Sequence, residues 1–184
     1  MDEMEGWPEE SKEAAQLVID KYGKPDESSD SVLIWNERGP WKRIVAYRDF
    51  DSHNFPAPHN DSVESFLKHE VATEKISDLA EFDGSVVVNR TRGELSARCH
   101  DEEANFLALN LASDIIKGEK TVKEAREYYA HEFLAYRKKE PTPYMEGLRF
   151  EPNGRRDADE RVLSDEELQQ AEEAGKAKQN QGGG

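Results

Sequence analysis

The sequence predicts an α+β fold in which two β-hairpins pack with an N-terminal helix and a C-terminal antiparallel helix pair, followed by a disordered acidic tail. Three observations favour this class. Segments with helical periodicity lie near the start and in the second half of the chain, and hairpin-like segments lie between them. No regular alternation of strands and helices indicates parallel βαβ units. Charge and apolar residues are also unevenly distributed, which confines the expected core to the middle of the chain.

The charge distinguishes the two ends of the 184-residue chain from its middle. The chain has 40 acidic residues against 25 Lys and Arg, a formal net charge of −15. Residues 1–30 hold 10 acids and 3 bases, and residues 151–184 hold 9 acids and 5 bases. Residues 31–150 are nearly balanced, with 21 acids and 17 bases. This distribution indicates solubility and mobile ends, and it disfavours nucleic acid as a partner.

These counts suggest a domain organisation. We expect a flexible N-terminus over residues 1–7, a single α+β domain over 8–140, and a largely disordered tail over 141–184. A polar, acidic segment cannot offset its ordering entropy by burying apolar surface. One local exception is predicted, because Ser164 begins a capping box that favours a short helix near 164–178.

The N-terminal elements are predicted to be a helix and then a hairpin. Residues 8–22 carry apolar side chains at i, i+3 and i+4 spacing, between a starting proline and a terminating glycine. Residues 31–36 and 41–47 read as two strands joined by a tight turn. Trp35 and Trp41 could lie near each other across this hairpin, where they would suit a contact with a protein partner.

The middle of the chain is predicted to be less regular. Residues 48–60 look like a loop, because two prolines impose an extended path. Residues 62–69 and 73–80 are interpreted as two short helices. Residues 83–89 and 94–99 are interpreted as a second hairpin, whose turn contains the glycine that a tight turn needs.

Two helices are expected to end the domain. Asp101 caps the first and Gly118 ends it, and its apolar residues lie almost all round, which predicts a central position. Thr121 and Glu124 form the capping box of the second, which ends before Pro141. The connection is so short that the two helices must be antiparallel.

One candidate site lies at the second hairpin and the start of the central helix: Arg90, Arg92, Arg98, Cys99 and His100. Arginines beside a helix N-terminus could bind a phosphate or carboxylate, and a thiol there could be nucleophilic. The alternative is that the cysteine is a small buried apolar residue and the arginines pair with acids. The site requires that the three arginines converge on one pocket.

A second cluster comprises Asp51, His53, His59, Asn60 and Asp61. Imidazole and carboxylate groups are ligands of divalent transition metals, so His53, His59 and Asp61 are the candidate metal ligands. The alternative is an ordinary turn with Asx-type backbone hydrogen bonds. The prolines within this stretch leave it open whether the ligands would be held in place.

Several function classes find no support in the sequence. None of the P-loop, GxGxxG, HExxH, GxSxG or CxxC motifs is present. No apolar run could span a bilayer, and the acidic, polar start does not resemble a secretory signal. A single cysteine excludes an intramolecular disulfide. We therefore expect a cytoplasmic protein that does not enter a membrane, with its cofactor and oligomeric state open.

Six short stretches of the chain carry a resemblance to known sequences: Tyr22–Asp26, Gly39–Arg43, Pro58–Asp61, Phe82–Ser85, Gly93–Cys99 and Asn105–Ala112. They resemble stretches of an uncharacterised bacterial protein family with no assigned activity. The resemblance covers roughly residues 15–135 and implies a bacterial-type soluble domain. It transfers no catalytic residue.

The function that the sequence favours is binding or protein interaction without catalysis. An alternative is a small enzyme or anion-binding domain that uses the arginine cluster at the helix start. A third hypothesis, an acidic mimic of nucleic acid, is the least favoured, because the acids gather in the ends rather than along an ordered stripe.

Overall fold

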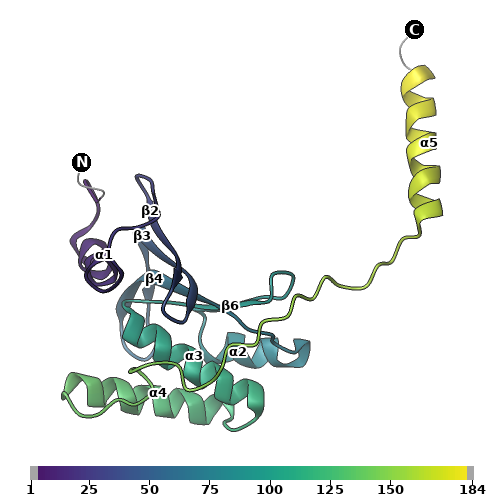
Figure 1. Ribbon diagram of the computed structural model, residues 1–184. Helices are drawn as coiled ribbons and strands as arrows, with labels where there is room; N and C mark the ends of the chain where they lie inside the picture. The colour runs from purple at the N-terminus through teal and green to yellow at the C-terminus, as the bar shows by residue number, and fades with distance from the viewer. Residues whose placement is uncertain (1–3, 182–184) are drawn as a thin grey trace.

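The computed structural model describes residues 4–181 and has the predicted α+β class (Figure 1). Its six strands form one antiparallel sheet in the order β1-β2-β3-β4-β6-β5. The strands are β1 (Glu27–Ser28), β2 (Val32–Arg38), β3 (Trp41–His53), β4 (His59–Lys68), β5 (Val86–Asn89) and β6 (Glu94–Cys99). The helices are α1 (Glu9–Tyr22), the 3₁₀ turn Thr73–Lys75, α2 (Ile76–Phe82), α3 (Glu102–Lys117), α4 (Val122–Arg137) and α5 (Asp165–Gln181).

The predicted helix over 62–69 was wrong, because these residues belong to strand β4. Much of the loop expected over 48–60 is also strand, in β3 and the start of β4. Val63, Ser65 and Leu67 alternate with more exposed neighbours and are each fully buried, which is the period-2 pattern of a strand. A serine in this buried row obscured the apolar alternation.

Strand β4 also joins the two expected hairpins into a single sheet. It pairs with β3 on one side and with β6 on the other. The sequence predicts two separate hairpins, whereas in the structure both belong to one continuous sheet. Helices α1 and α3 pack on the sheet, and α4 lies against α3 on the side away from it (Figure 1). The expected central position of the helix after Asp101 is confirmed, since most of α3 is buried.

Both tryptophans of the first hairpin are core residues rather than an exposed contact. Trp35 is fully buried, and its Nε1 donates to the Gly23 carbonyl oxygen at 2.9 Å. Trp41 stacks on Phe106 with ring centroids 4.8 Å apart. Burial of large aromatic surface stabilises the fold more than an indole exposed to water would. Because both indole rings are buried, neither can form the predicted contact with a protein partner.

The chain after α4 does not form the expected disordered acidic tail. Asn110 in α3 donates to the carbonyl oxygens of Tyr144 and Gly147 at 2.9 and 2.8 Å, and it accepts from the Arg149 amide at 2.8 Å. Met145 is buried against the core. One buried amide therefore satisfies three backbone groups and holds this segment in place.

Further along, the chain runs beside the β5–β6 turn. The Gly154 amide donates to the Lys68 carbonyl at 3.0 Å, and the Asp157 amide donates to that of Arg90 at 3.1 Å. Helix α5 then begins with the predicted capping box, in which Ser164 and Glu167 exchange hydrogen bonds, and it projects away from the body of the molecule (Figure 1).

The N-terminal segment also packs in the part that the structure describes. Trp7, within the stretch expected to be flexible, is buried, and its Nε1 donates to the Asp30 carbonyl at 3.0 Å. The predictions of a flexible N-terminus and a disordered tail also cover residues 1–3 and 182–184, which lie outside the described residues. Between residues 4 and 181, no helix is both long enough and apolar enough to cross a bilayer.

Candidate metal centre

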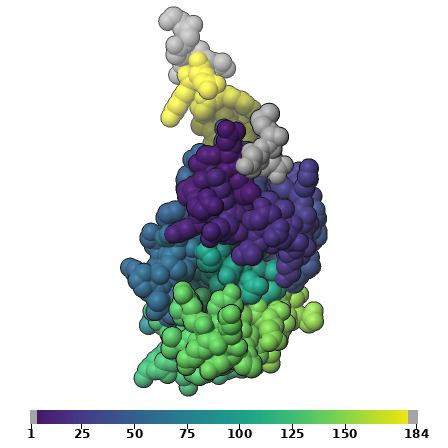
Figure 2. All heavy atoms as spheres, turned by 90° about the vertical axis from the view of Figure 1, so that its left-hand side faces the viewer, coloured from purple at the N-terminus to yellow at the C-terminus, as the bar shows by residue number. Residues whose placement is uncertain are grey.

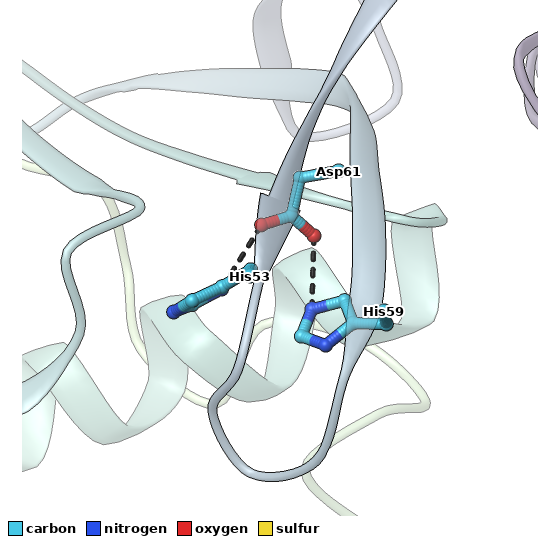
Figure 3. Close-up of side chains that lie close together, drawn as sticks. All are labelled: His53, His59 and Asp61. Carbon is cyan, nitrogen blue, oxygen red and sulfur yellow. Dashed lines mark hydrogen bonds and ion pairs between the residues drawn. The ribbon is translucent and has the colours of Figure 1, made fainter.

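The end of the β3–β4 hairpin brings together the three predicted metal ligands, His53, His59 and Asp61 (Figure 3). In the register of the two strands His53 lies opposite His59. Asp61 is two residues beyond His59 on β4, so the two side chains lie on the same face of the sheet. Residues that are separated in sequence by a proline-containing turn are thus placed side by side by strand pairing.

The Asp61 carboxylate lies between the two imidazole rings. Its Oδ2 is 3.0 Å from His53 Nδ1, and its Oδ1 is 2.9 Å from His59 Nε2. One ligand atom from each residue can be chosen so that all three lie within 4.8 Å of one another. Asp61 is only 2% exposed, so its charge must be compensated within the protein.

Each imidazole also has an acceptor beside its second nitrogen. His59 Nδ1 is 2.8 Å from the Ala57 carbonyl oxygen. His53 Nε2 is 3.8 Å from Asp83 Oδ1, too far for a direct hydrogen bond but within the range of an ion pair. Histidines that bind metals commonly donate their second N–H to a backbone carbonyl or a carboxylate, which orients the ring.

Negative charge is concentrated behind these rings. A hydrogen bond from the His59 imidazole to the Asp61 carboxylate raises the pKa of His59 above its ordinary value, an effect that outweighs the opposing effect of burial. Asp83 is buried as well, and its Oδ1 accepts from the amide and hydroxyl of Ser85, both at 2.8 Å. Its Oδ2 is buried without a hydrogen-bond partner among residues 4–181. Two buried carboxylates beside the two nitrogens of one imidazole favour positive charge there, either on the ring or as a bound cation.

The hairpin end is anchored to the helices despite its prolines. The Phe55 ring lies 5.0 Å from the ring of Tyr129 in α4 and 6.3 Å from that of Phe82 in α2, measured between centroids. The guanidinium carbon of Arg126 lies 3.8 Å from the centre of the Phe55 ring. These contacts hold the turn in one position, so the histidines on either side of it are preorganised.

The cluster can be reached from the surface. A hollow of about 400 Å³ is lined by His53, Asp61 and Arg98, among others. A second hollow, of about 540 Å³, is lined by both His53 and His59. A metal ion and a further small ligand could therefore approach without rearrangement of the core.

The arginine cluster predicted from the sequence does not converge. Arg90 lies at the β5–β6 turn, where it pairs with Asp157 and Asp159. Arg98 lies towards the opposite end of β6, where it pairs with Asp51 at 2.6 Å. An extended strand separates these two ends by roughly 3.3 Å per residue. Arg90 and Arg98, eight residues apart in the sequence, therefore lie towards opposite ends of β6.

The remaining residues of that cluster also take separate positions. The Arg92 amide donates to Asn89 Oδ1 at 3.1 Å, within the turn. Cys99 is 1% exposed, and burial raises the pKa of its thiol well above the ordinary value, which opposes a nucleophilic role. His100 lines two hollows that contain none of the three arginines. The structure therefore does not bring these residues together as one anion site.

Sequence reasoning missed two buried carboxylates. Asp83 was treated as the start of a strand, although Asp followed two residues later by Ser is typical of an Asx-type turn. The second is Glu102, in the first turn of α3. Its carboxylate accepts from the Tyr22 hydroxyl at 2.5 Å and from Trp41 Nε1 at 2.6 Å, and it pairs with Lys21. No local pattern marks such a contact across 80 residues of sequence.

Comparison with protein-family models, with curated proteins and with solved structures gives no match for this chain. The similarity to an uncharacterised bacterial family stays an expectation. A fold class alone does not determine activity, so only the side chains of the site indicate a function.

Proposed function

We propose that the protein acts by binding a divalent transition metal, with His53, His59 and Asp61 as the protein ligands. The observation that carries this proposal is the environment of His59. Its Nδ1 faces a backbone carbonyl at 2.8 Å and its Nε2 faces a carboxylate at 2.9 Å. Both neighbours are hydrogen-bond acceptors when Asp61 is ionised.

A neutral imidazole has one N–H and cannot donate to both acceptors. Since the Ala57 carbonyl can only accept, the N–H of a neutral His59 belongs on Nδ1. The lone pair of Nε2 then points at the Asp61 carboxylate, which is unfavourable without a cation between them. Either a second proton or a metal ion supplies that positive charge, and a metal ion would satisfy the His53 nitrogen as well.

The donor set indicates which ions fit. Two imidazoles and one carboxylate suit Zn²⁺ and its neighbours in the transition series, whereas Ca²⁺ and Mg²⁺ prefer sets made of oxygen alone. Three protein ligands leave at least one coordination position for water or another small ligand. A site of this kind binds an exchangeable ligand on the metal, unlike a closed structural site.

The test is calorimetric titration of the purified full chain with Zn²⁺, alongside thermal unfolding in the presence of the metal. We expect one equivalent to bind. Each ligand variant, His53→Gln, His59→Gln or Asp61→Asn, should weaken Zn²⁺ affinity by at least about tenfold. Changes to outer-shell partners alone typically weaken metal affinity by about tenfold to a hundredfold. Saturation at one hundred times the dissociation constant should stabilise the wild type by about 2.7 kcal/mol.

His131→Gln is the matched control, because it removes an exposed histidine from α4. It should leave the affinity unchanged. Asp83→Asn should give a smaller loss than the ligand variants if Asp83 only orients His53. Equal affinity of wild type and His59→Gln, or no stoichiometric binding at all, would exclude the proposed centre and leave the cluster as a hydrogen-bonded hairpin end.

A further inference from the structure

A separate cavity of about 390 Å³ lies between α1, the end of the β3–β4 hairpin, the start of α3 and the second half of α4. In the space-filling view, teal atoms from the middle of the chain are visible between purple α1, the blue hairpin and green α4 (Figure 2). The cavity volume lies within the range of roughly 300–1,000 Å³ that is typical of small-molecule sites.

Most of the wall is apolar or aromatic. Leu107 of α3 and Tyr129 of α4 are almost fully buried, at 0% and 3% exposure. Phe133 adds a second aromatic ring from α4, and Met145 contributes a flexible side chain from the segment held by Asn110. Such a lining favours an apolar body of aromatic or branched shape.

Two basic side chains of the same wall lack acidic partners among the described residues. Arg137 and His100 line the cavity, and neither forms an ion pair or hydrogen bond with a carboxylate among residues 4–181. The one acid in the wall, Asp101, uses its carboxylate to cap α3 by accepting from the Ala104 amide at 2.8 Å.

The position of Arg137 suits recognition of a planar anion. Its guanidinium carbon lies 5.0 Å from the centre of the Phe133 ring. Contact with an aromatic ring restrains the guanidinium while its N–H groups keep their capacity for two parallel hydrogen bonds to a carboxylate. A neighbouring hollow shares Arg137 and His100 but also carries Glu10 and Glu13, which disfavour an anion there.

We propose that this cavity is a binding site for a small organic carboxylate with an aromatic or branched apolar body, whose carboxylate binds Arg137 and whose apolar part lies against Leu107 and Phe133. This site goes beyond the metal centre. Although His59 contributes to the wall of the cavity, the ligand does not depend on a bound metal.

The test uses hydrocinnamate as the probe and NMR titration of the ¹⁵N-labelled full chain as the readout. We expect saturable shifts that include the amides of Leu107 and Phe133. Acetate lacks the apolar body and hydrocinnamamide lacks the charge, so each should bind at least about tenfold more weakly, the loss expected for one buried apolar group or one charge-assisted hydrogen bond. Equal binding of the amide, or no binding of hydrocinnamate, overturns the proposal.

Arg137→Gln should weaken hydrocinnamate by at least about tenfold, whereas Lys123→Gln at the opposite end of α4 should leave it unchanged. Arg137 is exposed, so the variant is expected to fold, and Arg137→Lys should retain part of the affinity. Zn²⁺ titration of the same variants separates the two proposals. Arg137→Gln should keep the metal and lose the carboxylate, and His53→Gln should do the reverse. Unchanged hydrocinnamate affinity in Arg137→Gln contradicts the assigned site.

Discussion

Replacement of Glu102 by alanine should be among the most destabilising single changes outside the apolar core. The carboxylate of Glu102 joins three elements, because it accepts from Tyr22 at the end of α1 and from Trp41 in β3 while lying in the first turn of α3. It also pairs with Lys21. Alanine removes the shared acceptor and leaves its donors in place.

The loss of stability depends on whether each donor can find another hydrogen-bond acceptor. Trp41 is 1% exposed, so its indole N–H would stay buried without a partner, at about 1–3 kcal/mol. The Tyr22 hydroxyl is only partly buried and can bind water instead, which limits its loss to about 0.5–1.5 kcal/mol. The Lys21 side chain is 52% exposed, so its ion pair adds little. We expect a total of about 1.5–4.5 kcal/mol.

The assay is urea denaturation followed by tryptophan fluorescence and circular dichroism, with the midpoint and slope fitted separately. Glu103→Ala is the matched control. Glu103 is exposed in the same first helical turn, and its replacement removes the same charge near the helix N-terminus. Glu102→Gln keeps one carbonyl acceptor and should lose less than alanine. The reasoning is refuted if Glu102→Ala costs no more free energy of unfolding than Glu103→Ala.

Three further changes test other parts of the structure. The ion pairs with Lys42 and Arg43 hold the pKa of Glu94 below its ordinary value, although burial, the largest single influence, acts in the opposite direction. A lowered folded pKa contributes stability that is present above the unfolded pKa of about 4.3 and lost as pH falls through the folded value, so Glu94→Gln should reduce the loss of stability measured on acidification. Cys99 should react with a thiol reagent far more slowly in the native protein than in urea, because its side chain is buried and its pKa is raised; rapid native labelling would contradict the packing. Gly93→Ala would place a Cβ 2.5 Å from the Arg155 carbonyl oxygen at a residue whose φ is +63°. It should expose the segment around Arg155 to limited proteolysis, whereas Gly84→Ala, which meets no atom within 4 Å, should not.

The helices were predictable because the interactions that delimit them are local. Asp101 caps α3 by accepting from Ala104, three residues later, and Gly118 ends it in the left-handed conformation. Thr121 and Glu124 form the predicted capping box of α4. Each device lies within four residues, so it can be recognised without knowledge of the fold.

The predicted metal ligands illustrate an intermediate case. The sequence singles out two histidines and an aspartate near one another, and alternation along a strand accounts for His59 and Asp61 sharing a face. Only the register of β3 with β4 sets His53 opposite His59, and only the packing of Phe55 against Tyr129 anchors the turn between them. Neither the strand register nor this ring contact can be deduced from the residues of the loop alone.

The sequence by itself determined the α+β class, the caps of its main helices and which side chains could bind a metal, because those depend on residue type and on spacings of a few residues. The tertiary structure decided that Val63, Ser65 and Leu67 belong to a strand that joins all six into one sheet. It also separated Arg90 from Arg98 and buried Trp35. Strand pairing and burial join residues that are distant in the chain, and no local pattern encodes which distant partner a residue will meet.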